Sequence, residues 1–115
     1  MDANSGRIAT QILIRKPQET VDDDGFPIIG HEYLFNGKPV WCEWVNAHGS
    51  EFYNAASLNL REPATLTMRY TSLVTTQCQI ERKSDGAIFD IVSIDNIRDK
   101  RNWLEIKVSR VVAQP

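Results

Sequence analysis

The chain has 115 residues, 42% hydrophobic and 24% charged, which is enough for a single domain spanning residues 1–115 with its own core. A net charge of −2 and an isoelectric point of about 5.6 give no overall basic footprint for nonspecific nucleic-acid binding. No apolar run approaches the roughly 20 residues of a membrane-spanning helix. The first residues do not resemble a signal peptide, so we expect no membrane association and a cytoplasmic product.

A strand followed by a long loop is predicted at the start of the chain. Ile8, Ile12 and Ile14 lie at alternate positions of the segment 7–16, which indicates a half-buried strand. The next segment, 17–30, contains two prolines, two glycines and three consecutive aspartates. Residues of these types favour turns and irregular structure, so this segment is predicted to be a long loop.

The middle of the chain is predicted to contain two strands and a short helix. Residues 31–35 are expected to begin the second strand, and Asn36-Gly37 suits the positive φ angles of a tight hairpin turn. Residues 39–46 are expected to form the third strand. In Gly49–Asn59 the apolar spacing changes to that of a helix, with Ser50 as the predicted N-cap.

The second half of the chain alternates strand-like segments with turn signals, and apolar residues recur mostly at every second position. We predict strands at 64–71, 76–83, 87–94 and 103–112, a hairpin turn at Ser84–Gly86 and a charged loop at 95–102. Segment 87–94 is apolar at positions of both parities, as in a central strand. The sequence therefore predicts an all-β fold, a small antiparallel β-barrel or sandwich of about six or seven strands with one short helix and long loops.

The segment Trp41–Ser57 contains a histidine and a serine close together, which raises the question of catalysis. A hydrolase nucleophile elbow needs Gly-x-Ser-x-Gly between a strand and a helix. The run around His48 and Ser50 reads A-H-G-S-E and lacks the second glycine. We therefore expect no catalytic residues and no enzymatic activity.

The candidate metal ligands do not have the spacing of a metal site. Structural zinc sites show ligand pairs two to four residues apart, whereas His31, Cys42, His48 and Cys78 are scattered. The three adjacent residues Asp22–Asp24 do not alternate as the ligands of a calcium loop do. We expect buried, unpaired thiols, a solvated acidic turn, and neither a metal nor another cofactor.

Tryptophan provides the strongest indication of binding. Trp41 and Trp44 are three residues apart on a predicted strand, so their side chains should lie on opposite faces. One can join the core, and the other is exposed or covered by a partner, as interface aromatics are. The basic residues Arg98, Lys100 and Arg101 are either solvated or contact the rim of a partner.

The order of short motifs along the chain resembles the head–tail joining, or head closure, proteins of long-tailed phages and prophages. The matching elements are an early D-x-x-G, a tryptophan strand, a G-x-E before an alanine-containing helical turn, an arginine–aromatic pair, a G-x-x-F-x-I hairpin and a final apolar strand. They lie at Asp22–Gly25, Trp41–Val45, Gly49, Glu51, Ala55, Arg69-Tyr70, Gly86–Ile91 and Trp103–Val112. One departure is the presence of Cys42 and Glu43 where the family commonly has small residues.

The resemblance implies a non-enzymatic part of the virion. Such proteins form a ring below the portal or its adaptor at the head–tail junction, retain packaged DNA and offer a docking surface to the tail. The implied partners are the portal or connector adaptor protein, a tail or tail-completion protein, and further copies of the same chain, which is expected to be a monomer in solution. DNA is expected to pass the channel without sequence-specific binding, and assembly is expected in the bacterial host cytoplasm.

By the same resemblance, segments 17–30 and 46–59 are the expected contacts with neighbours or the channel. The residues expected there or in the basic loop are Asp22, Asp23, Asp24, His48, Glu51, Arg98, Lys100 and Arg101. A tail-completion protein is a related alternative. A different alternative is an OB-like nucleic-acid-binding module, with Trp41, Tyr70 and Phe89 as a stacking platform for single strands.

Overall fold

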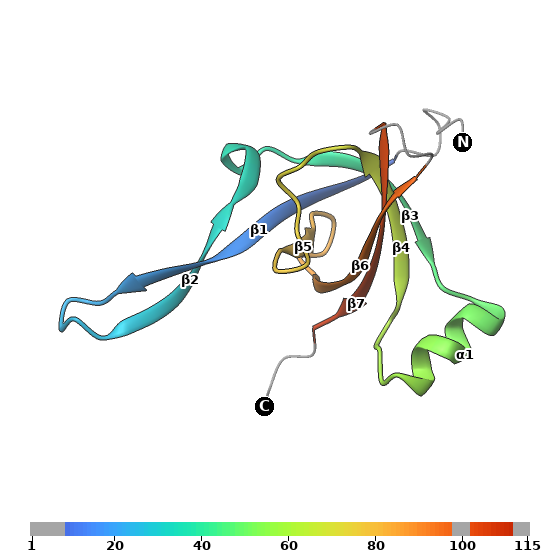
Figure 1. The fold of residues 1–115 in the computed structure, drawn as a ribbon, viewed down its shortest axis with the longest axis horizontal. Coiled ribbons are helices and arrows are strands. Elements are labelled where there is room, and N and C mark those ends of the chain that lie inside the picture. The colour runs from blue at the N-terminus through green and yellow to red at the C-terminus, as the bar shows by residue number, and fades with distance from the viewer. Residues whose placement is uncertain (1–8, 98–101, 112–115) are drawn as a thin grey trace.

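The computed structural model describes residues 9–97 and 102–111, which form seven strands and one α-helix (Figure 1). The elements are β1 (Thr10–Val21), β2 (Pro27–Tyr33), the 3-10 turn η1 (Leu34–Gly37), β3 (Val40–Asn46), α1 (Gly49–Ser57), β4 (Ala64–Arg69), β5 (Gln79–Arg82), β6 (Ile88–Ile97) and β7 (Trp103–Arg110). The predicted all-β class with one short helix is confirmed. No helix among these residues is long and apolar enough to cross a membrane.

Six of the strands close into an antiparallel barrel, in the order β1-β3-β4-β7-β6-β5. The ring closes where Ile12–Arg15 of β1 pairs with Gln79–Arg82 of β5. β2 pairs with β1 alone and lies outside the ring. Of the two predicted architectures, the barrel is therefore the one that forms.

The barrel interior is filled by alternate residues of each strand. β7 contributes Leu104, Ile106 and Val108, and β4 opposite contributes Leu66 and Met68, all at most 3% exposed. β1, β3, β5 and β6 complete this core with Ile12, Ile14, Cys42, Ile80, Phe89 and Ile91. The period-two pattern read from the sequence thus corresponds to the inward face of the barrel.

The predicted long loop at 17–30 is wrong, because most of it forms a hairpin. β1 continues past Arg15 and pairs with β2 up to Val21↔Pro27. Beyond Arg15 this part of β1 has β2 as its one strand partner, so it is an edge strand, where a proline such as Pro17 is tolerated. Pro27 begins β2, which is another position that suits proline.

Side-chain hydrogen bonds hold the base of this hairpin against the barrel. The Arg15 guanidinium donates from Nε and Nη2 to Gln79 Oε1, at 3.1 and 2.9 Å. Tyr33 Oη donates to Glu81 Oε1 at 2.8 Å. Both acceptors belong to β5, so the strand that closes the barrel also fixes the point at which the hairpin leaves it.

The Asn-Gly turn has the expected backbone conformation but a different role. Asn36 and Gly37 adopt φ angles of 55° and 77°. The turn joins β2 to β3, yet these strands do not pair with each other, because β1 lies between them. The predicted tight hairpin at this position is therefore wrong.

Two predictions for β6 also need correction. Phe89 and Ile91 are buried, but Val92, at a register shift between Ile91 and Ser93, is 43% exposed, so this strand buries one face. The predicted charged loop at 95–102 begins later, since β6 runs to Ile97 and pairs there with β7. The Ser84–Gly86 turn between β5 and β6 is confirmed as a hairpin turn.

Helix α1 is inserted between the paired strands β3 and β4. The Ala47 amide donates to the Pro63 carbonyl at 2.9 Å, which closes the base of the insertion. The N-cap position belongs to His48, so the prediction of Ser50 as N-cap is wrong; Ser50 lies inside the first turn. No residue of α1 (49–57, all described) is buried.

An arginine covers an aromatic pair at the β5–β6 hairpin. Trp44 and Phe89 meet edge to face at 4.8 Å, and the Arg82 guanidinium lies about 5 Å from both ring centroids, at 5.2 and 5.1 Å. The same guanidinium donates two hydrogen bonds to the Asp85 carboxylate, at 3.0 and 2.6 Å. The bond to Arg82 is the main cause that holds the pKa of Asp85 well below its usual range.

We expect Phe89→Ala to destabilise the fold strongly. Phe89 is 1% exposed, and removing a buried phenyl ring usually costs about 3–5 kcal/mol through lost transfer free energy and the cavity left behind. Val92→Ala on the same strand is the control, expected within about 1 kcal/mol of the parent protein because its side chain is exposed. Urea denaturation measures both, and equal losses would contradict the inward placement of Phe89.

The bond between Arg82 and Asp85 predicts a pH-dependent contribution to stability. Because folding lowers the pKa of Asp85, its ionised form stabilises the fold above the ordinary carboxyl pKa of about 3.9, and this contribution disappears as the pH falls through the folded-state pKa. Asp85→Asn should therefore be less stable than the parent protein at neutral pH, with a smaller difference in acid. Denaturation at several pH values checks this, with Asp23→Asn as the control for a surface aspartate. A difference that does not change with pH would contradict it.

Candidate assembly surfaces

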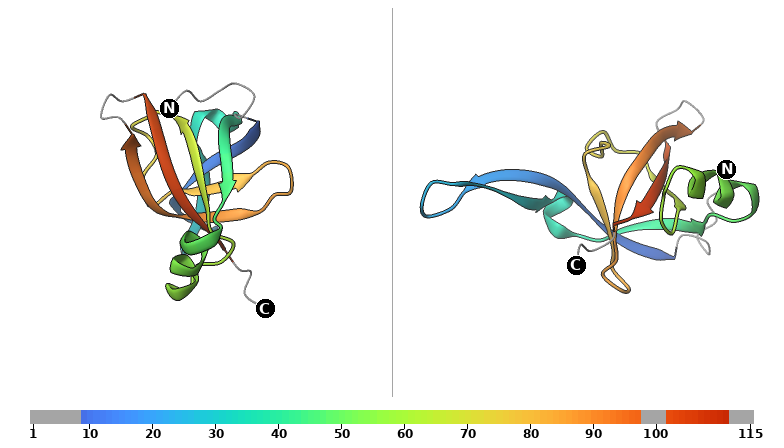
Figure 2. Two further views of the ribbon diagram at one scale, coloured as in Figure 1. Left: turned by 90° about the vertical axis from the view of Figure 1, so that its right-hand side faces the viewer. Right: turned by 90° about the horizontal axis from the view of Figure 1, so that it is seen from below.

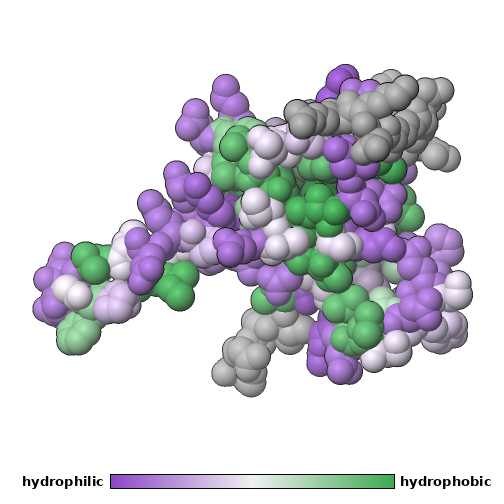
Figure 3. Space-filling model, in the orientation of Figure 1, coloured by the Kyte–Doolittle hydropathy of each residue, from purple (hydrophilic) through white to green (hydrophobic). Residues whose placement is uncertain are grey.

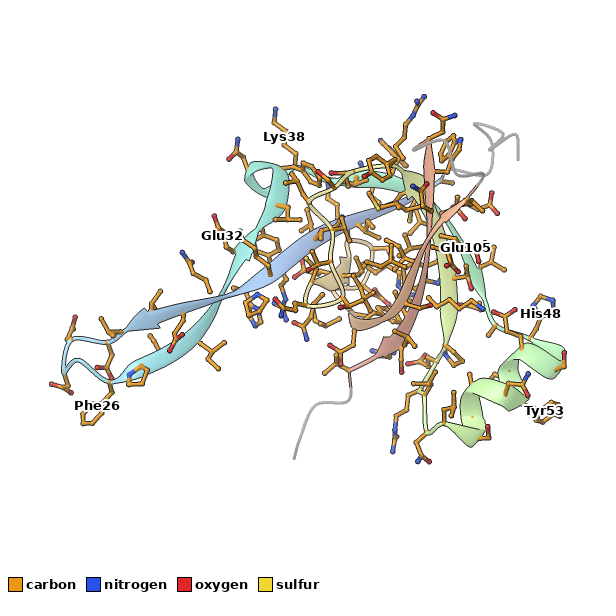
Figure 4. The ribbon with its side chains drawn as sticks, viewed as in Figure 1. Phe26, Glu32, Lys38, His48, Tyr53 and Glu105 are labelled. Atoms are coloured by element: carbon orange, nitrogen blue, oxygen red, sulfur yellow. The ribbon has the colours of Figure 1, made fainter. Side chains whose placement is uncertain are left out.

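Two extensions leave the barrel at opposite ends of the molecule. The β1–β2 hairpin projects at one end of the long axis, and α1 lies at the other (Figure 2). The overall extents are 51 × 31 × 27 Å, so the hairpin accounts for much of the elongation. Figure 4 places Phe26 at the hairpin tip and both His48 and Tyr53 at the helix end.

The tip of the hairpin is an ordered acidic turn. Asp22 Oδ1 accepts hydrogen bonds from the amides of Asp24 and Phe26, at 3.0 and 2.8 Å, and the Asp22 amide donates to the Phe26 carbonyl at 2.9 Å. This Asx-type turn uses one carboxylate for structure. Asp23 and Asp24 are exposed and have no ion pair with any residue that the structure describes.

The same hairpin exposes large apolar side chains. Val21, Phe26 and Ile29 are 67%, 65% and 77% exposed, and Ile28 is exposed as well. The register places Val21 opposite Pro27 and Thr20 opposite Ile28, so apolar residues occur on both faces of the ribbon. Figure 3 shows hydrophobic residues among hydrophilic ones along this projection. Such exposed patches commonly mark interaction sites.

The helix end has a similar character. Phe52 and Tyr53 contact each other edge to face at 5.9 Å and are both exposed, as is Leu58 just after the helix. His48 lies at the N-cap, exposed, with Nδ1 3.3 Å from the Asn46 carbonyl. Glu51 accepts a hydrogen bond from Thr65 Oγ1 at 3.3 Å, which connects the first turn of α1 to β4.

A cleft of about 360 Å³ lies between α1 and the adjoining barrel residues. Helix α1 contributes Ser50, Glu51, Asn54 and Ala55, the segment after it contributes mainly apolar groups, and β4, β6 and β7 supply the opposite wall. The lining residues include Ala55, Leu58, Leu60, Val92, Lys107 and Val108. The cleft is therefore mostly apolar, with the Lys107 ammonium and the Glu51 carboxylate on its wall.

The predicted site residues do not form one cluster. Asp22, Asp23 and Asp24 lie in the turn between β1 and β2 at the hairpin tip, whereas His48 and Glu51 lie at the start of α1. The predicted basic residues Arg98, Lys100 and Arg101 lie outside the described residues. Among the described residues, no group of three or more His, Cys, Asp or Glu side chains is placed to hold a metal ion.

The structure confirms the division of the two strand tryptophans but not the aromatic platform. Trp41 is 52% exposed, whereas Trp44 packs against the core. The platform predicted for an OB-like nucleic-acid binder needs Trp41, Tyr70 and Phe89 together on the surface. Phe89 instead points into the barrel, and Tyr70 packs against the core, so that prediction is wrong.

Both cysteines are buried, unpaired thiols, as predicted. Cys42 is fully buried on β3 and Cys78 is 2% exposed. Burial, with a smaller contribution from the neighbouring Glu43 carboxylate, raises the pKa of the Cys42 thiol to about 12. A thiol in this state is a packing residue and a poor nucleophile.

Sequence reasoning missed the apolar character of both extensions. The run Phe26-Pro-Ile-Ile was included in a loop because of its prolines and glycines, although three of its residues are apolar and exposed. The signal was the presence of strand-forming residues on both sides of an Asp-Gly turn, which is typical of a hairpin. The exposure of Phe52 on the helix, 45%, was not predicted either.

A family model for the phage head completion protein matches residues 3–111 of the chain. Among curated protein sequences, none matches significantly. The solution structure of protein SF1141 from Shigella flexneri 2a is similar with a TM-score of 0.71 and 20% identity, covering 96% of this chain and 99% of that one. A chain in the virion of a native gene transfer agent particle is similar with a TM-score of 0.58 and 15% identity, covering 90% and 94%. At these identities, the two structures show a shared fold.

We expect neither native thiol to react with a disulfide reagent in the folded protein. Cys42 and Cys78 are both shielded from solvent, and the reactive species is the thiolate. Ellman's reagent should therefore detect both thiols only after unfolding in guanidinium chloride. Leu73→Cys is the positive control, because Leu73 is 55% exposed. Rapid reaction of a thiol in the folded parent protein would contradict the described packing.

Proposed function

Because the chain belongs to the phage head completion protein family, we propose that it completes the head at the connector with the tail. Membership makes it a structural protein of the virion and not an enzyme. In the proposed role, several copies form a ring below the portal or its adaptor. The ring closes the portal channel, retains the packaged DNA and presents a surface on which the tail docks.

The observation that carries this proposal is the family match over residues 3–111, which includes both extensions and the whole barrel. The structural likeness to a chain in the virion of a gene transfer agent particle supports it, because that chain is part of an assembled particle. The proposed location is therefore the head–tail junction of the virion, with the bacterial host cytoplasm as the place of assembly.

The distribution of surface groups supports a role in assembly. The closed barrel has few free strand edges, so we assign contacts with other subunits to the hairpin and to α1, where most of the exposed aromatic and aliphatic residues lie. Exposed apolar residues of this kind are enriched at protein interfaces. The proposed neighbours are further copies of the chain, the portal or adaptor protein, and a tail or tail-completion protein.

The charged residues support passage of DNA without tight adhesion. Asp22, Asp23 and Asp24 lie on the exposed hairpin tip, and acidic groups that face a channel repel phosphates. We propose them, with His48 and Glu51, as contacts to neighbours or to the channel. Arg98, Lys100 and Arg101 are proposed for the same role on the basis of sequence. A net charge of −2 favours a soluble monomer before assembly.

Reconstitution on connector particles tests the proposal. The purified chain is added to portal–adaptor particles and analysed by analytical ultracentrifugation, alone and in the mixture. The chain alone should sediment as a monomer, and in the mixture a fixed number of copies should join each particle. Added to DNA-filled heads that lack it, the chain should also protect the packaged DNA from nuclease.

Other outcomes identify the alternatives. If the chain does not bind the connector particles but binds the end of isolated tails, it is a tail-completion protein. If the chain binds neither connector particles nor tails but binds single-stranded DNA at low salt, it is a nucleic-acid-binding module. Either result overturns the proposed role at the head side of the junction.

A further inference from the structure

We propose that the tip of the β1–β2 hairpin of one copy occupies the cleft beside α1 of the next copy. The inference rests on the proposed function, because it names the surfaces through which copies join one another. The tip is defined by Val21, Phe26 and Ile29 together with the acidic turn between them. The cleft is the space of about 360 Å³ between α1 and the barrel.

The two surfaces match in chemistry. Val21, Phe26 and Ile29 are each about two-thirds exposed or more, which leaves a large apolar area in contact with water. The cleft is lined mainly by aliphatic groups, among them Leu58, which is 69% exposed. Insertion of the tip would remove apolar surface of both partners from water at once.

The charges of the two surfaces are partly complementary. Between residues 17 and 30 the hairpin carries Glu19 and three aspartates and no basic residue. On the cleft side, Lys107 and Glu51 both lie on the wall, so the wall itself carries one charge of each sign. Arg61 and Arg110 lie on adjoining backbone, where the Arg110 amide donates to the Arg61 carbonyl at 2.8 Å, and the Arg110 guanidinium forms an ion pair with Glu62. Lys107 and Arg61 have no ion pair with another described residue, so they remain available to acidic groups of a neighbour.

The geometry excludes occupation of the cleft by the hairpin of the same copy. The tip and α1 lie at opposite ends of the 51 Å long axis, with the closed barrel between them (Figures 1 and 2). The base of the hairpin is fixed to β5 by the bonds of Arg15 and Tyr33, which hold its direction away from the cleft. The tip can therefore reach a cleft of this kind only on another copy.

A contact between two different surfaces of one chain is head to tail. A pair of copies joined in this way still has one free tip and one free cleft, so further copies can add at both ends. The row closes into a ring where the rotation that relates neighbouring copies brings the last copy to the first. A hairpin tip is a small interface, below the roughly 800 Å² per partner of stable complexes. A monomer in solution that assembles on a connector template is consistent with this size.

Cross-linking of engineered cysteines tests the proposal. Ile29→Cys with Leu58→Cys puts one reactive thiol on the tip and one on the cleft, and both positions are exposed enough to tolerate the change. The native thiols are buried and give no background. The variant is assembled on connector particles, treated with a short thiol-to-thiol cross-linker and separated on a denaturing gel.

A ladder that extends beyond the dimer is the expected result, with loss of most of the monomer band, because each copy joins two different neighbours. Ile29→Cys with Leu73→Cys is the matched control, with the second thiol on the exposed loop between β4 and β5, outside the cleft. It should remain monomeric. A bound variant that stays monomeric, or a dimer from Ile29→Cys alone that reports contact between tips, overturns the proposal while leaving the proposed function intact.

If the chain does not join the particles at all, the proposed function fails instead. Cross-linking is then carried out on the free double variant at high concentration. A ladder there supports the head-to-tail contact independently of the connector. Monomers alone at high concentration overturn the contact as well.

Discussion

The pairing of β1 with β5 is the constraint on which the rest of the structure depends. Through Ile12–Arg15 it closes the barrel, buries Ile12 and Ile14 inside, and leaves the part of β1 beyond Arg15 outside the ring. That part can pair only with β2, so closure of the barrel and projection of the hairpin are two results of one long strand. Arg15 and Tyr33 then bind β5 side chains and fix the angle between the two parts.

The division between a closed barrel and two projecting elements suits a virion protein that joins other proteins. Most apolar residues of the barrel strands are buried in the core, as Phe89 and Ile106 are, and their burial stabilises the folded chain. The exposed apolar residues are concentrated on the hairpin and around α1, where little of their area is covered by the chain itself. Residues that do not stabilise the monomer are available to stabilise an assembly, which is the usual arrangement at interfaces.

The class of fold and most of its strands could be predicted from alternation alone. Leu104, Ile106 and Val108 alternate because one face of β7 is buried, and the Ser84–Gly86 turn follows from its residue types. The errors have physical causes. Prolines at an edge strand and at the first position of a strand are compatible with pairing, so segment 17–30 formed a hairpin where composition indicated a loop. Ser50 has a capping side chain, but His48 holds the capping position.

By itself, the sequence determined the β class, the positions of most core residues, the absence of a cysteine pair at metal-site spacing and the resemblance to head closure proteins, because these depend on local pattern and on motif order. Only the tertiary structure decided which strands meet. The pairing of β1 with both β3 and β5 joins segments far apart in the chain, and local pattern carries no information about such partners. The same long-range pairing decided that the hairpin turn with Asp23 and the helix with Glu51 lie at opposite ends of the molecule, and that apolar residues near each of them face solvent.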